Sequence, residues 1–199
     1  MSIFSTPDSI NAMFKKEENF ADYLSKSEKE EEKKKFQKNY ERFTPTPQDL
    51  IFLMNLEHQI KIVVVSAYWC FDCQVTIPIL AKLTESSHEK VSLLILKKED
   101  NQQFLVGTNG GERIPIVYFL SFDGFLIERW IERPTLIYQY YGALRKKMGW
   151  ENDSFTVEYR KGYLDEYEKF SRAIAEDIKT KLERTEAIMS SSSRIHKSQ

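Results

Sequence analysis

The sequence predicts an α/β fold in which a mixed sheet of about four strands is flanked by helices, with helical extensions at both ends. Two apolar runs, 61–67 and 91–96, are expected to be strands buried on both faces, because neither shows regular polar alternation. Asp123-Gly124 marks a hairpin further along the chain. Strands that alternate with helical segments are typical of βαβ units.

The composition is that of a globular protein with one core. The chain has 199 residues, of which 41% are hydrophobic and 30% charged. A formal net charge of −1 gives no electrostatic reason to expect nucleic acid or an anionic membrane as a partner. No apolar run reaches the ~18–20 residues of a membrane-spanning helix. The first 16 residues lack the regions of a signal peptide, which predicts a cytoplasmic protein.

Residues 1–45 are expected to form a helical N-terminal extension. Thr6-Pro7 supplies the N-cap and first residue of a helix, and apolar residues recur at helical spacing as far as Leu24. The charged run 28–35 predicts a solvated helical face with Glu–Lys pairs rather than a binding tract.

Residues 46–150 are expected to form the central domain. Thr46-Pro47 begins a helix that runs to about residue 57, after a clear break in the chain. The hairpin at Asp123-Gly124 suits a tight type I′ turn. The other expected elements are helices at 71–86, 100–106 and 135–148, and hairpin strands at 116–122 and 125–132.

Residues 151–188 are expected to form one long C-terminal helix, followed by a polar, Ser-rich tail at 189–199 that should be disordered. The apolar side of this helix is expected to pack on the core rather than to form a partner groove. Its members are Tyr163, Tyr167, Phe170, Ile174, Ile178 and Leu182.

Both cysteines lie in the segment Trp69-Cys70-Phe71-Asp72-Cys73, where the first buried strand gives way to a helix. At a helix N-terminus, free N–H groups and the helix dipole stabilise a thiolate, the reactive form of sulfur. Cys70 is therefore expected to attack a substrate disulfide. Cys73, one turn inside the helix, would resolve the mixed disulfide.

The cysteine pair has two other interpretations. An inert pair in the core is disfavoured by the position between strand and helix. A zinc site normally has four ligands. The chain has no second cysteine pair, and His58, His88 and His196 are isolated in the sequence, so no metal is expected.

Neighbouring residues have two interpretations each. Trp69 either covers the sulfurs as a docking surface or simply packs. Asp72 is either a solvent-facing first-turn acid that stabilises the helix or a residue that tunes the sulfurs, and both can hold. A negative charge beside Cys70 would disfavour its thiolate and make the couple more reducing. Lys97 and Lys98 are expected at the surface.

Over residues 61–148 the sequence resembles the thioredoxin superfamily. The segment 69–73 matches the thioredoxin WCxxC site, and Pro78 matches the proline that kinks the active-site helix. Ile114-Pro115 resembles the Ile-Pro whose cis peptide bond faces the sulfurs. The sequence looks closest to bacterial thioredoxin-like proteins with a helical N-terminus, a WCxDC site and a Glu-Arg-Pro after the hairpin, here 132–134.

The resemblance implies a thioredoxin-like fold and a cytoplasmic thiol–disulfide oxidoreductase that works in the reducing direction. Trp69, Ile114 and Pro115 would form the substrate groove, and backbone at Ile114 would pair with a substrate strand. No cofactor is implied. The expected partners are a protein or small-molecule disulfide, and a reductase or low-molecular-weight thiol as electron donor.

Three departures from thioredoxin stand out. Phe71-Asp72 replaces Gly-Pro between the cysteines, Val64 replaces a buried acid, and Ile116 replaces the usual Thr after the proline. The alternative function is a non-catalytic interaction module on a thioredoxin fold, since fold does not imply function. The apolar residue at Val64 and the helical extensions favour that alternative.

Overall fold

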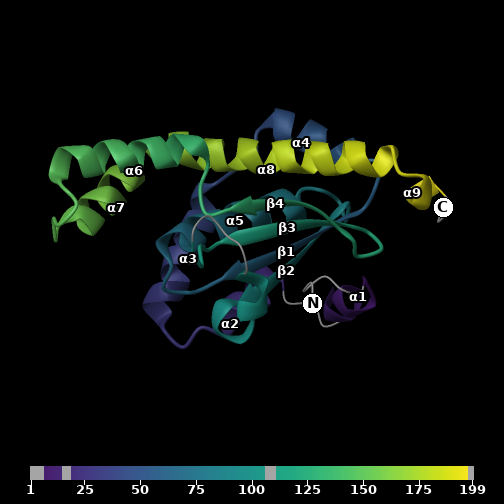
Figure 1. Ribbon diagram of the computed structural model, residues 1–199, viewed down its shortest axis with the longest axis horizontal. Coiled ribbons are helices and arrows are strands. Elements are labelled where there is room, and N and C mark those ends of the chain that lie inside the picture. Colours follow the sequence, from purple (N-terminus) through teal and green to yellow (C-terminus); the bar gives the residue numbers. More distant parts are fainter. Residues whose placement is uncertain (1–6, 15–18, 106–110, 197–199) are drawn as a thin grey trace.

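The computed structural model describes residues 7–14, 19–105 and 111–196, and a four-stranded sheet forms its centre (Figure 1). Strand β1 pairs in parallel with β2 and antiparallel with β3, and β3 pairs antiparallel with β4. The predicted mixed sheet is confirmed. The strands are β1 (Ile60–Ser66), β2 (Val91–Lys97), β3 (Ile116–Ser121) and β4 (Leu126–Ile131), in the order β2-β1-β3-β4.

Strand β1 is an inner strand, with a partner on each side. Val63, Val64 and Val65 have no exposed surface, as the lack of polar alternation predicted. Parallel strands need a crossover connection, and helix α5 (Phe71–Glu85) supplies it between β1 and β2. The site at the start of α5 is therefore attached to a deeply buried inner strand.

Helices α3 (Glu30–Arg42) and α8 (Tyr167–Ser190) hold α5 in place. Helix α3 packs on α5, while α8 packs on α5, β3 and β4. Figure 1 shows α8 as the long helix that crosses the molecule beside the sheet, with α6 and α7 near one end and α9 at the other. The other α-helices are α1 (Pro7–Phe14), α2 (Phe20–Ser25), α4 (Pro47–Met54), α6 (Thr135–Met148), α7 (Phe155–Asp165) and α9 (Ser193–His196).

The N-terminal extension contains separate helices α1 and α2, with residues 15–18 outside the described ranges. The solvated charged face is confirmed on α3, where Lys35 pairs with Glu31 at 2.6 Å and Lys33 with Glu30 at 2.7 Å. Phe36 on the opposite side has no exposed surface. The expected helix at 46–57 ends earlier, at Met54, and 3₁₀ turns over Lys98–Asp100 and Gln102–Leu105 stand in place of a helix at 100–106.

The single C-terminal helix that the sequence predicted is two helices, α7 and α8, which meet at Glu166. The prediction that the apolar side packs on the core is confirmed, because Phe170, Ile174 and Ile178 are buried. No helix in the described ranges is both long and apolar enough to cross a membrane.

The expected disorder of the tail is wrong over residues 189–196. Helix α8 continues to Ser190 and α9 follows, while residues 197–199 lie outside the described ranges. Met189 and Ile195 are fully buried, and Arg194 pairs with Asp123 in the hairpin turn. Two apolar anchors and one ion pair thus order a segment whose average composition is polar.

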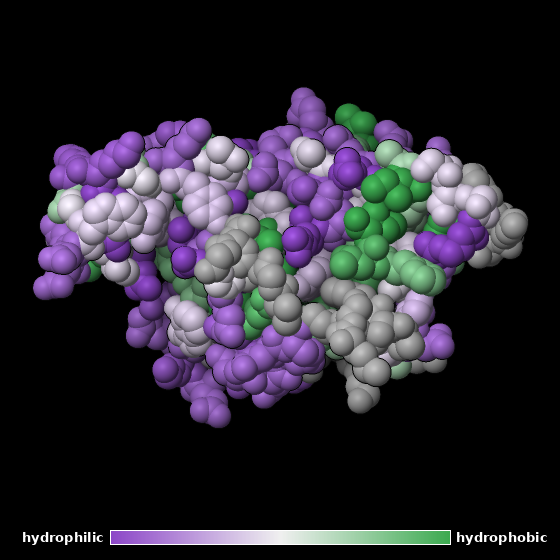
Figure 2. Space-filling view, in the orientation of Figure 1, coloured by the Kyte–Doolittle hydropathy of each residue, from purple (hydrophilic) through white to green (hydrophobic). Residues whose placement is uncertain are grey.

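An apolar area lies beside this contact. Figure 2 shows hydrophilic residues over much of one face and an apolar area near the end where α9 meets the hairpin. Phe125, Leu126 and Ile188 are exposed there by 44%, 40% and 38%. They line a cleft of about 270 Å³ together with Met189 and Ile195.

The hairpin turn has a different geometry from the predicted type I′. Gly124 has a φ of 96°, but Asp123 does not have the positive φ that a type I′ turn requires. The Gly124 N–H donates to the Ser121 carbonyl at 2.9 Å, and the Ser121 N–H donates to the Phe125 carbonyl at 2.9 Å. The loop is therefore three residues long and ends on a left-handed glycine.

Candidate functional site

Cys70 and Cys73 lie at the start of α5. Cys70 is the N-cap residue, and its Sγ accepts a hydrogen bond from the Cys73 backbone N–H at 3.4 Å. Both thiols are free. Cys70 keeps 7% of its surface exposed while Cys73 has none, so only the first cysteine is accessible to a molecule in solution.

The environment of Cys73 disfavours its ionised form. Burial raises the pKa of the Cys73 thiol well above its ordinary value, and the adjacent Cys70 thiol adds to this. Hydrogen bonds from the Ala67 backbone and the Ser66 side chain act in the opposite direction. The buried sulfur therefore has specific partners that favour its thiolate.

The Ile114-Pro115 peptide bond is cis, as predicted. The Cys70 thiol donates to the Ile114 carbonyl oxygen at 3.7 Å, which places this peptide bond beside the site.

Trp69 is 57% exposed, so simple packing does not explain its position. Its indole N–H donates to the Glu99 carboxylate at 3.1 Å. Lys97 is exposed as expected, whereas Lys98 is partly buried and pairs with Glu112 at 3.3 Å.

Asp72 lies in the first turn of α5, as expected, but the expectation that it faces solvent is wrong. Its carboxylate accepts two hydrogen bonds from Arg133, at 3.0 Å from Nε and 2.7 Å from Nη2, and Tyr159 lies at 3.5 Å. Burial raises the pKa of the Asp72 carboxyl, and Arg133 opposes this rise. A two-point contact with a permanently charged guanidinium favours the ionised form of the carboxyl.

Phe71, the other residue between the cysteines, packs on the C-terminal extension. Its ring meets Tyr159 at 5.8 Å and Tyr163 at 5.1 Å, both from α7. A cleft of about 310 Å³ opens beside Cys70, and residues from α7 form one of its walls. Its lining includes Trp69, Cys70, Ile114, Arg133, Phe155 and Tyr159.

Residues 17–146 match the family profile described as Thioredoxin. The chain belongs to the thioredoxin family. Among solved structures it is similar to a protein of unknown function from Pseudomonas aeruginosa, at 18% identity and a TM-score of 0.63 over 86% of this chain and 95% of that one. It is also similar to an HIV epitope-scaffold, at 19% identity and a TM-score of 0.61 over 87% and 96% of the two chains.

These two likenesses concern the fold alone, because the identities are low. No curated protein matches the chain. Both residues between the cysteines contact the C-terminal extension, Phe71 at Tyr163 and Asp72 at Tyr159. The two-point contact of Asp72 is with Arg133, which precedes α6 and lies outside that extension.

Sequence analysis did not find the roles of Arg133, Tyr159, Ser66 and Tyr23. Arg133 belongs to the Glu-Arg-Pro segment at 132–134, so its position was noted without its partner. Ser66 could have been noticed as a hydroxyl residue within an apolar strand. Nothing in the sequence connects Tyr159 or Tyr23 with the cysteines, because both contacts depend on how the extensions fold back.

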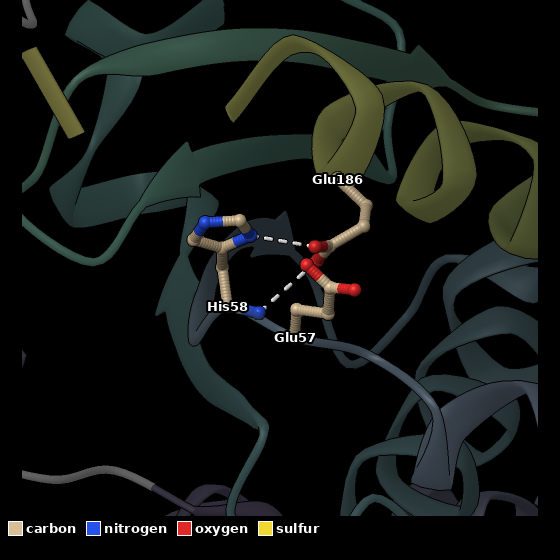
Figure 3. Close-up of side chains that lie close together, drawn as sticks. All are labelled: Glu57, His58 and Glu186. Carbon is tan, nitrogen blue, oxygen red and sulfur yellow. Dashed lines mark hydrogen bonds and ion pairs between the residues drawn. The ribbon is translucent and has the colours of Figure 1, made fainter. Parts of the chain in front are cut away.

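His58 is not isolated, in contrast to what the sequence suggested. Its Nδ1 lies 2.6 Å from a Glu186 carboxylate oxygen, and its backbone N–H donates to the other oxygen at 3.4 Å (Figure 3). Glu57 is close enough to complete a three-residue group of possible metal ligands. Two of these three residues, His58 and Glu186, already contact each other directly. This contact attaches α8 to the segment before β1.

Proposed function

We propose that this thioredoxin-family protein is a thiol–disulfide oxidoreductase that reduces disulfides through Cys70 and Cys73. The observation that carries the proposal is the arrangement of the two sulfurs. Cys70 caps α5 beside a cis X-Pro bond and reaches the surface, while Cys73 lies buried behind it. No cofactor or metal enters the reaction.

The reaction has two exchange steps. The Cys70 thiolate attacks one sulfur of the substrate disulfide, forming a mixed disulfide and releasing the other sulfur as a thiol once it takes up a proton. Cys73 then attacks the Cys70 sulfur, forming the Cys70–Cys73 disulfide and releasing the second substrate thiol. A reductase or a low-molecular-weight thiol, such as the cytoplasm provides, would return the pair to the dithiol form.

The substrate groove in this proposal comprises Trp69, Ile114 and Pro115. The exposed indole of Trp69 offers an apolar contact surface beside the cleft. An extended substrate segment would hydrogen-bond to the backbone at Ile114, whose carbonyl lies next to the Cys70 sulfur. The substrate is a disulfide in a protein or a small molecule.

The alternative is a non-catalytic interaction module. The contact of α7 with Phe71 and Asp72 favours it, because that contact fixes the segment between the cysteines and walls one side of the site. Turnover of insulin or of a small disulfide in the presence of dithiothreitol separates the two functions. An interaction module would show no turnover above that of the variant lacking both thiols.

Trapping tests the roles of the two sulfurs. Cys73→Ser should accumulate mixed disulfides, because its attacking thiol remains while the resolving thiol is gone. Cys70→Ser should capture little, because the remaining sulfur is buried. Non-reducing gels after incubation with a disulfide-bonded protein would measure this. Equal capture by both variants, or more capture by Cys70→Ser, would contradict the assignment.

A further inference from the structure

Two buried hydroxyl groups lie behind the Cys73 sulfur. Ser66, at the end of β1, has no exposed surface, and its hydroxyl acts to lower the pKa of the Cys73 thiol, which is likewise fully buried. The Tyr23 hydroxyl donates to Ser66 Oγ at 3.0 Å. Tyr23 belongs to α2, so the N-terminal extension reaches the interior of the site.

The direction of these bonds determines what they can do. A serine hydroxyl carries one proton and can accept as well as donate. Because Tyr23 donates to Ser66 Oγ, the Ser66 proton is free to point at the Cys73 sulfur. The Ala67 backbone also acts to lower the pKa of the Cys73 thiol. Two donors converging on one buried sulfur stabilise a negative charge there.

Tyr23 is held firmly as a donor. Burial raises the pKa of its hydroxyl far above the ordinary value, so the hydroxyl keeps its proton. Its ring stacks on Tyr68 with 4.5 Å between centroids and meets the edge of Phe36 at 5.8 Å. The Tyr68 hydroxyl also donates to the Tyr23 backbone carbonyl at 2.7 Å.

We propose that Ser66 and Tyr23 are positioning residues that stabilise the Cys73 thiolate during resolution of the mixed disulfide. The inference rests on the proposed function. In this step the Cys73 thiol loses its proton and its sulfur attacks Cys70 Sγ. The Cys70–Cys73 bond forms while the bond from Cys70 to the substrate sulfur breaks. The departing substrate thiolate takes up one proton, so atoms and electrons balance.

The two exchange steps can be measured separately with 5,5′-dithiobis(2-nitrobenzoate). When the reduced full chain is in excess over this probe, attack by Cys70 releases one coloured thiolate and attack by Cys73 releases the second. Ser66→Ala should slow the second release about tenfold, as expected from loss of a hydrogen bond to a charged group. Tyr23→Phe should slow it by a smaller factor, because Tyr23 acts on the sulfur through Ser66. The first release should stay within about twofold of wild type.

Two further variants serve as controls. Ser66→Thr keeps a hydroxyl and should retain the second release. Tyr167→Phe removes another buried hydroxyl, which donates to the Asn39 carbonyl at 3.1 Å, and should change neither release. If Ser66→Ala does not fold, Tyr23→Phe decides alone, since it removes one oxygen atom and keeps the ring stacking.

The inference is overturned if the second release is unchanged in Ser66→Ala and Tyr23→Phe. It is also overturned if both releases slow equally, or if Ser66→Thr slows the second release as much as Ser66→Ala does. Either result would indicate a general disturbance of structure. Failure of the proposed function would look different, since wild type itself would then release no coloured thiolate.

Discussion

Asp72 lies between the two cysteines, yet its carboxylate forms an ion pair with Arg133. Burial alone would lower the pKa of the Arg133 guanidinium, but the Asp72 carboxylate raises it above its ordinary value. Arg133 also lies 3.3 Å from Glu132, so the cation has two acidic neighbours. The sulfurs therefore experience an ion pair rather than a lone carboxylate.

Replacing Asp72 by Asn should shift the cysteine couple in the oxidising direction. The substitution leaves the Arg133 charge less compensated near Cys70, which favours the thiolate and hence the dithiol form. We expect a change on the order of 10–30 mV. Equilibration of both proteins with glutathione buffers would measure it, and an unchanged or more negative potential would remove Asp72 from the tuning of the site.

The same ion pair should be strongly coupled in stability. Asp72→Asn alone should reduce the free energy of unfolding by about 3 kcal/mol, since it leaves a largely buried cation without its main partner. Adding Arg133→Met should recover part of this loss. Urea unfolding of the two single variants and the double variant gives the coupling energy. Additive losses would show that the pair contributes little.

At the scale of elements, the hairpin turn and α1 depend on each other. A Cβ at Gly124 would lie 2.9 Å from the Pro7 carbonyl oxygen, and the Asn11 amide donates to the Asp123 carbonyl at 3.2 Å. The turn therefore needs glycine for two reasons, its positive φ and the close approach of α1.

Two glycine-to-alanine substitutions should have opposite effects on stability. Gly124→Ala should lower the free energy of unfolding by at least roughly 1–2 kcal/mol, the usual cost of a left-handed residue with a side chain. Gly142→Ala, inside α6 where the added Cβ meets no atom within 4 Å, should raise it by up to about 1 kcal/mol. Urea denaturation measures both, and equal signs would contradict the described turn.

Elements with a strong local signal could be predicted from sequence, and contacts between distant elements could not. Apolar runs located β1 and β2, and the cysteine spacing located the start of α5. The break between α7 and α8 at Glu166 has no Pro or Gly at that position to mark it. Arg133 and Asp72 are 61 residues apart, so only the folded chain brings them together.

At the scale of the whole molecule, both extensions are built into the core. The Asn39 side chain of α3 donates to the Gln74 carbonyl in α5 at 2.8 Å, and Tyr167 of α8 donates to the Asn39 carbonyl. Asp49 of α4 pairs with Arg172 and Lys179 of α8, each at 3.1 Å. Three segments distant in sequence therefore share buried polar contacts.

The Asp49 contact should make stability depend on acid pH. Burial alone would raise the pKa of Asp49, but hydrogen bonds from Thr46 and Lys179 lower it below its ordinary value. Wild type should therefore be more stable than Asp49→Asn above the unfolded-state pKa of about 3.9, and this advantage should shrink as pH falls below it. Urea unfolding across pH 3–7 tests this, with exposed Asp165→Asn as control. A difference that stays constant down to pH 3 would contradict it.

The sequence predicts two extensions and a central domain, divided near residues 45 and 150. We predict that these three parts unfold as one unit. Unfolding α8 would expose Phe170, Ile174 and Ile178 and leave the Trp130 indole, which donates to Asp177 at 3.2 Å, without its partner. Tryptophan fluorescence and far-ultraviolet circular dichroism should therefore give coincident urea transitions. Amides of α3 and α8 should exchange with solvent only through global opening. If helical signal is lost before the fluorescence change, the extensions fold separately and do not support the candidate site.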